Sequence, residues 1–394
     1  MKEVWSDSKD ATSRAGSPGI DNQTARQFAA NLDANLSEIE KRLRAGSFGF
    51  SRLRPIFIAK PNSNKERVIC VPTVRDRLVQ RTIVEHLTLS EALPIYNSSS
   101  FGFVKGQGTA KAIDRAVELR SLYDWCVKAD IEAFFDQISR KQLKERVAAA
   151  LPRQSLVPLI WSAIDCEVRG TREVLERIAR QGIHPGRGIR QGMPLSPLLA
   201  NLTLSKFDRT VEREKIPMIR YADDLLMFFS TKEEASAGRE FVEKHLSLIG
   251  LKLSQAKTSI YGPKDNVVFL GLEIAFLDKL GKFVSRVSRP QIRKIRDRLE
   301  SEFTLEKLTN ESVDMSAATV RLSRSVAAYL GAYQKAHDFV TLRSELERCM
   351  KEIQANLYVE VFGPTAFDRL DDRARKFLGI FDPAIPPPSE DFDH

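Results

Sequence analysis

Two adjacent aspartates lie in the middle of an apolar run, and this feature constrains the fold more than any other. Residues 219–229 read Ile-Arg-Tyr-Ala-Asp-Asp-Leu-Leu-Met-Phe-Phe. Apolar side chains recur at alternate positions on both sides of Asp223-Asp224, which predicts two strands joined by a tight turn that holds the acids. Burying a carboxylate is costly unless it is paired or binds metal, so both acids are candidate Mg²⁺ ligands. The alternative is an exposed hairpin turn, where aspartate is common.

A second acid of the same kind follows another apolar run. Residues 125–131 read Trp-Cys-Val-Lys-Ala-Asp-Ile and predict a buried strand that ends near Asp130. Asp130 could instead be the N-cap of a following helix, a position that favours aspartate. If Asp130 and Asp223 converge, they are suited to hold two divalent ions, which clamp the attacking and leaving oxygens of an in-line phosphoryl transfer.

Between the two acids lies a segment dense in glycine and proline. Residues 188–197 read Gly-Ile-Arg-Gln-Gly-Met-Pro-Leu-Ser-Pro. Such a run fixes an unusual backbone path and lets a bulky ligand approach closely. It also fits an ordinary helix entry, with Ser196 as the cap and Pro197 at the first helical position. The two interpretations are compatible, because one loop can both cap a helix and form a binding wall.

The composition restricts the partners and the compartment of the protein. Lysine and arginine number 61 against 52 acidic residues, and the formal charge of +9 suits a polyanionic partner. A chain of 394 residues has room for two or three subdomains. No apolar run is long enough to span a bilayer and no secretory signal opens the chain, so we expect a soluble, cytoplasmic protein. Neither a zinc site nor a disulfide framework is supported by the scattered cysteines, Cys70, Cys126, Cys166 and Cys349.

Hydrophobic periodicity divides the rest of the chain into helices and short strands. The opening stretch, to about residue 22, is polar and is expected to be irregular. A β-hairpin is predicted from residues 52–58 and 66–71. After residue 290 the chain is helical and basic, and residues 383–394 form a Pro-rich acidic tail that we expect to be disordered. The predicted helices cover residues 24–44, 74–92, 109–122, 139–182 with a break at Gly170, 196–214, 232–249, 316–334 and 338–357.

In order and spacing, these motifs resemble the reverse transcriptases of the bacterial, group II intron-like lineage over roughly residues 15–275. The matching segments are motif A at 130–136, motif B at 190–197, motif C at 221–224, Lys-Thr-Ser at 257–259 for motif D, Phe-Leu-Gly-Leu at 269–272 for motif E, and the upstream segments 58–61, 67–72, 74–80 and 101–106. The resemblance implies an α+β right-hand polymerase fold. It assigns an N-terminal extension and helix to 1–50, fingers with part of the palm to 51–125, a palm of antiparallel sheet and helices to 126–285, a helical thumb to 286–382, and the tail to 383–394.

The roles of the family carry over onto the matching acids and bases. Asp130 and Asp223 would be catalytic ligands of two Mg²⁺ ions, with Mn²⁺ as a substitute, and Asp224 would support them. Lys60 and Arg67 would meet the triphosphate of the incoming dNTP, although either could be a solvated charge at a strand edge.

Further positions would contact the nucleotide or the nucleic acid. Phe135 falls at the steric-gate position, where an aromatic ring would exclude a ribose 2′-OH, but it could be a plain core residue. Gln191 would line the nucleotide pocket. Lys257 resembles the motif D lysine, a proton donor to pyrophosphate, or it is a surface lysine. A groove for the template–primer backbone, or simply a solvated helix face, is predicted at Arg289, Arg293, Lys294 and Arg296.

The resemblance implies an RNA-directed DNA polymerase, and it leaves the subtype to be chosen. We favour the defence-associated reverse transcriptases of bacteria, which act with a cognate noncoding RNA, because the chain is compact and shows no His/Cys-rich nuclease segment. The expected partners are a structured RNA template, dNTPs and the cDNA product, and no membrane. The expected biological role is antiviral defence. The protein could also form a homo-oligomer. The alternatives are a group II intron maturase-like enzyme, a retron-type enzyme, and an RNA-binding splicing cofactor whose polymerase is vestigial.

Overall fold

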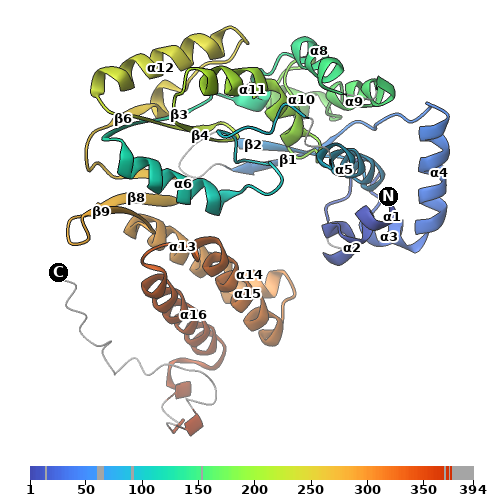
Figure 1. Cartoon of the computed structure of the whole chain (residues 1–394). Coiled ribbons are helices and arrows are strands. Elements are labelled where there is room, and N and C mark those ends of the chain that lie inside the picture. Colours follow the sequence, from blue (N-terminus) through green and yellow to red (C-terminus); the bar gives the residue numbers. More distant parts are fainter. Residues whose placement is uncertain are drawn as a thin grey trace. The chain divides into compact units, whose positions relative to one another are not determined.

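The computed structural model describes residues 1–13, 16–59, 66–89, 93–151, 154–367, 370–371 and 373–374. The chain folds into two compact units, Met1–Pro263 and Lys264–His394. Helices and antiparallel sheets are mixed in the first unit, and a small sheet precedes a group of helices in the second (Figure 1). The predicted α+β class is therefore confirmed. Lys60 and the predicted tail at 383–394 lie outside the described residues.

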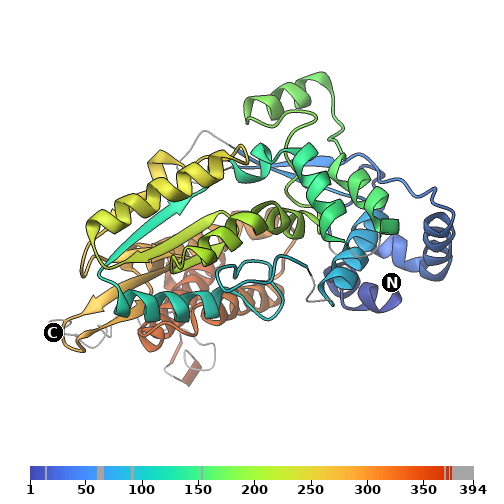
Figure 2. The same cartoon turned by 45° about the horizontal axis from the view of Figure 1, so that its top comes forward.

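The first unit is built on a four-stranded antiparallel sheet in the order β4-β5-β3-β6. Helix α12 (Lys232–Ser247) contacts β3 and β5, while α6 (Thr109–Leu122) contacts β4 and β5 from the other side, so both faces are covered (Figures 1 and 2). A sheet covered on both faces buries continuous apolar runs rather than alternating ones. This explains why the run after the acids includes Leu226 and Phe228 as well as the alternate positions. The strands are β3 (Trp125–Asp130), β4 (Met218–Tyr221), β5 (Asp224–Phe229) and β6 (Ser259–Tyr261).

The opening of the chain is helical, contrary to the expectation of an irregular stretch. Helices α1 (Lys2–Ser6) and α2 (Lys9–Ser13) are too short to form on local propensity. Tertiary contacts hold them: the Trp5 ring lies 5.1 Å from the Phe28 ring, and buried Asp10 forms ion pairs with two arginines of α5 (Val74–Thr88). The helix predicted at 24–44 is divided at Asn31 into α3 (Ala25–Ala30) and α4 (Leu32–Arg44).

The predicted hairpin forms from β1 (Arg54–Ala59) and β2 (Glu66–Val71), which pair in antiparallel register. Its buried side chains pack with Leu53, Val168 and Met193 in a small core of their own. A larger core joins the N-terminal helices and α12 to the sheet. The remaining helices of this unit are α7 (Phe134–Gln137), α8 (Arg140–Ala150), η1 (Gln154–Leu156), α9 (Val157–Ile164), α10 (Arg172–Arg180), α11 (Ser196–Arg213) and η2 (Gln255–Lys257).

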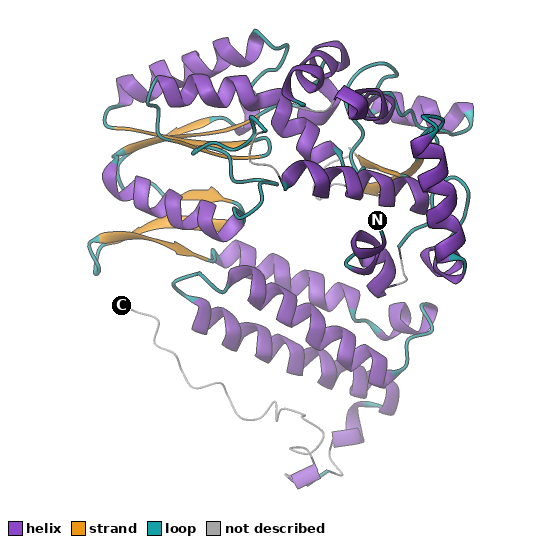
Figure 3. Cartoon of the chain, turned by 45° about the vertical axis from the view of Figure 1, so that its right-hand side comes forward, coloured by secondary structure: helices purple, strands orange, loops and turns teal. Residues whose placement is uncertain are grey.

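The second unit begins with the antiparallel sheet β7-β8-β9 and continues as helices (Figure 3). The long helices α15 and α16 pack side by side, and α13 and α14 pack against α16. Leu322, Leu346 and Cys349 are among the buried side chains at these contacts. The elements are β7 (Val267–Phe269), β8 (Leu272–Leu277), β9 (Lys282–Arg286), α13 (Arg289–Glu302), α14 (Leu305–Asn310), α15 (Met315–Tyr333), α16 (Phe339–Phe362) and η3 (Pro364–Phe367).

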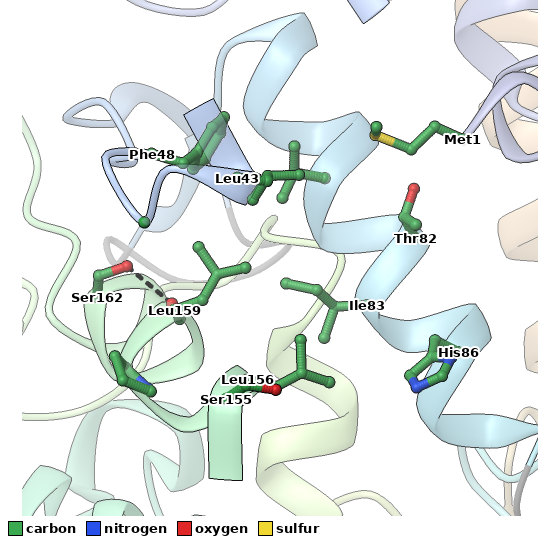
Figure 4. A pocket seen from close by; sticks show the side chains of 13 residues that line it. Met1, Leu43, Phe48, Thr82, Ile83, His86, Ser155, Leu156, Leu159 and Ser162 are labelled. Atoms are coloured by element: carbon green, nitrogen blue, oxygen red, sulfur yellow. Dashed lines mark hydrogen bonds between the residues drawn. The ribbon is translucent and has the colours of Figure 1, made fainter. Parts of the chain in front are cut away.

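An apolar hollow of about 710 Å³ lies among the N-terminal segments, α5 and α9. Figure 4 shows Leu43, Phe48, Ile83 and Leu159 turned toward it, with His86 at its edge. None of the residues predicted to carry chemistry lines this hollow. In the part of the chain that the structure describes, no helix is long and apolar enough to cross a membrane.

Candidate active site

The paired acids lie at a two-residue turn between β4 and β5. Tyr221 pairs with Asp224 across this hairpin, and Ala222 adopts a left-handed conformation with φ 57°. On the other side of β5, Asp224 lies directly opposite Asp130 in the β3–β5 register. The main chain ties the turn to β3, because Ile131 N donates to Asp223 O at 3.0 Å. The fold therefore brings Asp130 to the Asp223-Asp224 pair at one end of the sheet, although they are far apart in sequence.

Crowding and burial make Asp223 and Asp224 hard to ionise. Burial, followed by the charge of Asp130, raises the pKa of Asp223. Burial also raises the pKa of Asp224 to about 6, and the charges of Asp130 and Asp223 add to the effect. The Oδ1 atom of Asp224 is buried and accepts no hydrogen bond from any described residue. A divalent cation would satisfy this oxygen and offset the repulsion, so the donor set fits a hard metal ion.

Two basic residues lie within electrostatic reach of the acids. Lys257 donates to both carboxylate oxygens of Asp130 at 2.9 Å, although its own side chain is largely exposed. Arg67, on β2, is exposed, and its charge lowers the pKa of Asp223 against the larger effects of burial and Asp130. The structure thus places both predicted residues near the acids.

A buried ion pair beneath the turn was not predicted from the sequence. Arg220 on β4 and Asp208 on α11 are both fully buried, and the guanidinium binds the carboxylate through Nε at 2.8 Å and Nη2 at 2.5 Å. Arg220 Nη1 also donates to the carbonyl oxygen of Ala222 at 3.2 Å. Further hydrogen bonds join Arg220 to Asn201 and Ser100. The signal that could have revealed this network was an arginine in an otherwise apolar strand, since a buried charge requires a partner.

A close backbone contact completes the support of the turn. Gly102 follows the bridge between Ser100 and Arg220, and a Cβ atom at this glycine would lie 2.7 Å from Ala222 N. Asn201 donates to Gly102 O at 2.9 Å. The segment around Gly102 is therefore part of the wall that holds the acid turn.

The Gly- and Pro-rich loop touches two other segments of the site. At Gly188, with φ 70°, a Cβ atom would lie 2.7 Å from the main chain of Asp136, just after Phe135. At Gly192, with φ 106°, it would lie 2.8 Å from Cys70 O on β2. Cys70 N donates to Gln191 O at 2.7 Å. The loop is thus clamped between the segment after Asp130 and the β1–β2 hairpin. It leads into α11, but the prediction of Ser196 as the cap was wrong: Leu195 is the N-cap, and the Ser196 hydroxyl donates to Arg190 O at 2.8 Å.

Phe135 and Gln191 remain partly accessible, as residues that contact a substrate must be. Phe134 is buried in the core, whereas Phe135 is half-buried, and their ring centroids are 5.5 Å apart. The two rings follow Ala133, which has a left-handed backbone with φ 45°. This bend lets one ring enter the core and the other stay at the surface.

The basic residues predicted on the second unit divide into two groups. Arg289, Arg293 and Lys294 lie on α13 and are exposed. Arg296 differs, because Glu300, Glu345 and Glu352 surround its guanidinium, the last at 2.7 Å. We therefore assign Arg296 to the packing of α13 on α16 and keep the other three as candidates for nucleic-acid contact.

Paired carboxylates flanked by basic side chains fit one class of protein, the enzymes that transfer phosphoryl groups. Residues 58–274, more than half of the chain, match the model of the reverse transcriptase (RNA-dependent DNA polymerase) family. The chain belongs to this family and is an RNA-directed DNA polymerase. The predicted right-hand polymerase fold and the resemblance to the group II intron-like lineage are thereby confirmed.

The chain is similar to two bacterial proteins and to a solved telomerase structure. Protein YkfC of Escherichia coli (strain K12) is 26% identical over 364 residues, which cover 80% of this chain and 88% of that protein. The group II intron-encoded protein LtrA of Lactococcus lactis subsp. cremoris is 26% identical over 206 residues, which cover 52% of this chain and only 32% of LtrA. A solved structure of apo telomerase from Candida tropicalis covers 89% of this chain and 72% of that one, with 14% identity and a TM-score of 0.45.

Proposed function

We propose that this reverse transcriptase copies a cognate noncoding RNA into cDNA at Asp130, Asp223 and Asp224. The observation that carries the proposal is the convergence of these three acids at one end of the β4-β5-β3 sheet, inside the segment that matches the family. A protein that only binds RNA has no need for crowded, buried carboxylates, which disfavour folding when they are ionised.

The acids fit a divalent cation, and Mg²⁺ is our choice. Among the described residues no group of three or more His, Cys, Asp and Glu side chains is arranged to enclose a metal. This agrees with Mg²⁺, which proteins often hold with one or two carboxylates together with phosphates of the substrate. Two bound ions would neutralise the attacking and leaving oxygens of the phosphoryl transfer. Asp130 and Asp223 would hold them, with Asp224 in support.

The surrounding residues would orient the nucleotide. Arg67 is suited to the triphosphate, because it is exposed on the hairpin and acts electrostatically on Asp223. Phe135 would exclude a ribose 2′-OH, and Gln191 would line the pocket from the loop. Lys257 would donate a proton to the leaving pyrophosphate, and its contact with Asp130 brings its ammonium group beside the acids. Lys60 retains its proposed triphosphate role from the sequence alone.

We place the enzyme in bacterial antiviral defence, with Arg289, Arg293 and Lys294 following the template–primer backbone. The formal charge of +9 supports a nucleic-acid partner. Group II intron-like activity is the second candidate, because the chain is similar to the group II intron-encoded protein LtrA. Sequencing the nucleic acid that co-purifies with the protein distinguishes them: one recurrent structured RNA with its cDNA supports our assignment, and intron RNA supports the alternative.

Extension of a primed RNA template with dNTPs and Mg²⁺ tests the catalytic assignment. Asp223→Asn should slow extension by at least about 100-fold, the scale on which removing one electrostatic stabiliser slows catalysis. Asp33→Asn, at an exposed aspartate of α4, serves as the matched control and should leave the rate unchanged. As an independent readout, Mg²⁺ should raise the melting temperature of the wild type more than that of Asp223→Asn. Equal extension by Asp223→Asn and the wild type would exclude the assignment.

The same assay tests the steric gate. Phe135→Ala should incorporate rNTPs more readily while retaining dNTP incorporation, because the small side chain leaves room for the 2′-OH. Unchanged selectivity between rNTPs and dNTPs would remove Phe135 from this role.

A further inference from the structure

A second hollow lies between α8 and α11, and its lining is basic. It has a volume of about 570 Å³ and includes Arg146 on α8 together with Lys206 and Arg209 on α11. Glu145 also lines it and is acidic. Neither the three acids of the active site nor residues 188–192 line it. The hollow is therefore a separate site within the first unit (α8 and α11 are labelled in Figure 1).

Arg146 is the least satisfied of these cations. Its Nη1 atom is buried and has no hydrogen-bond partner among the described residues, and burial lowers the pKa of its guanidinium. A partly buried charge without a counterion is unfavourable, so such a group is poised to take up an anion.

The other two cations lie on one face of α11. Lys206 and Arg209 are three residues apart in the helix, which places them on the same side of it. Neither forms an ion pair with a described residue, whereas their neighbours Lys144 and Arg213 pair with Asp165 and Glu214. With three cations against one acid, Glu145, the lining of the hollow keeps a net positive charge.

We propose that this hollow binds the phosphodiester backbone of RNA, through Arg146, Lys206 and Arg209. Guanidinium groups bind phosphate oxygens in a bidentate manner, and the ammonium of a lysine adds a point charge. Separate cations on two helices suit the repeated phosphates of a chain better than one compact anion. An RNA segment held here would be anchored outside the catalytic turn while another segment serves as the template.

Binding of a structured RNA of about 60 nucleotides, measured by fluorescence anisotropy at several salt concentrations, tests the proposal. The triple variant Arg146→Gln, Lys206→Gln, Arg209→Gln should bind this RNA about tenfold more weakly at about 0.15 M salt. The slope of log affinity against log salt should become shallower by about 2 to 3, since each lost phosphate contact removes about 0.7 on a single strand and about 0.9 on a duplex. Extension of a short primer–template, which is too short to reach both sites, should stay unchanged.

The control variant removes the same charge elsewhere, with Lys41→Gln, Lys141→Gln and Lys244→Gln at lysines of α4, α8 and α12 that do not line the hollow. Identical affinities and salt slopes for the two triple variants would overturn the proposal. Melting temperatures distinguish a structural role of Arg146 from RNA binding. If Arg146 only packs the two helices, its loss would lower stability without changing the salt slope.

Two further measurements identify the ligand, the first with the wild-type protein and the second with the wild type and the triple variant. RNA containing 4-thiouridine should crosslink to peptides of α8 or α11 when excess short primer–template occupies the active site; crosslinks confined to other peptides would contradict the assignment. Inorganic phosphate and dNTPs are tested by thermal shift. If they stabilise the protein through these three residues while RNA affinity does not depend on them, the site takes small phosphate compounds and the RNA assignment is wrong.

Discussion

At the scale of the residue, Asp224 combines a proposed catalytic position with an unfavourable environment. Burial and two neighbouring acids raise its pKa to about 6, from 3.8. An acid whose pKa is raised on folding contributes stability below its unfolded pKa, and this contribution is lost as the pH rises through about 6. In the absence of metal, Asp224 therefore destabilises the folded protein at neutral pH.

Asp224→Asn should make the metal-free protein more stable at pH 8, by about 1–3 kcal/mol, since one pKa unit corresponds to about 1.4 kcal/mol. The gain should vanish near pH 4, where the carboxyl of the folded wild type is protonated. Urea unfolding at the two pH values measures this. The variant should also extend primers more slowly than the wild type. A variant that is less stable than the wild type at pH 8 would show that Asp224 is satisfied in the fold.

Arg220 and Asp208 act on the Asp223-Asp224 turn from a fully buried position. Asp208→Asn leaves the Arg220 charge buried without a counterion and should cost about 3–5 kcal/mol of unfolding free energy. Replacing both, as Asp208→Leu with Arg220→Met, should recover part of that stability, because the unpaired buried charge is removed while Asn201 and Ser100 lose their hydrogen bonds to Arg220.

The double variant should still extend primers poorly, since the hydrogen bond from Arg220 to Ala222 O is lost. Urea unfolding and primer extension on the same samples separate the two effects. Full activity in the double variant would mean that the ion pair supports folding but does not position the acids.

At the scale of the element, close main-chain contacts fix the backbone path of the loop at 188–192. Gly188 and Gly186 have similar left-handed backbones, with φ 70° and 75°, but only Gly188 of the two has atoms where a Cβ would lie. Gly188→Ala should therefore lower both stability and primer extension, whereas Gly186→Ala should show only the smaller effect of backbone strain, about 1 kcal/mol.

The comparison of these two variants by thermal melting and primer extension isolates the contact with Asp136 from the conformational preference of glycine. Equal effects would show that the loop can move away from the segment after Asp130.

Elements with strong periodicity were predicted well, and those held by distant partners were not. The helix at 109–122 and the strand before Asp130 agree with α6 and β3, because each carries its apolar pattern locally. Helices α1 and α2 were missed, since their stability comes from contacts with α3 and α5 that no local pattern encodes.

At the scale of the whole molecule, each unit carries its own buried thiols. Burial raises the pKa of Cys70 and Cys166 to about 12 in the first unit, and that of Cys349 to about 11 in the second. Native protein at pH 8 should therefore react slowly with iodoacetamide at all four buried cysteines, because the thiolate is the reactive form.

Labelling across a urea titration, with peptide mapping by mass spectrometry, should report the units separately. Cys70, Cys126 and Cys166 should become reactive together, and Cys349 at its own midpoint, since each unit has a core of its own. A single midpoint for all four would show that the two units unfold as one cooperative body.

The sequence alone determined the acids, the order of the motifs and the family, because these depend on residue types at short spacings. An Asp-Asp pair between two apolar strand patterns can be recognised without coordinates, and so can the Gly- and Pro-rich loop. Only the tertiary structure decided which distant groups meet. It placed Asp224 opposite Asp130, set Arg220 on Asp208 beneath the turn, removed Arg296 from the basic surface and left Arg146 Nη1 without a described partner. Electrostatic and hydrogen-bond energies depend on distances between atoms. For residues far apart in the sequence, the folding of the chain sets those distances, and local sequence patterns do not encode them.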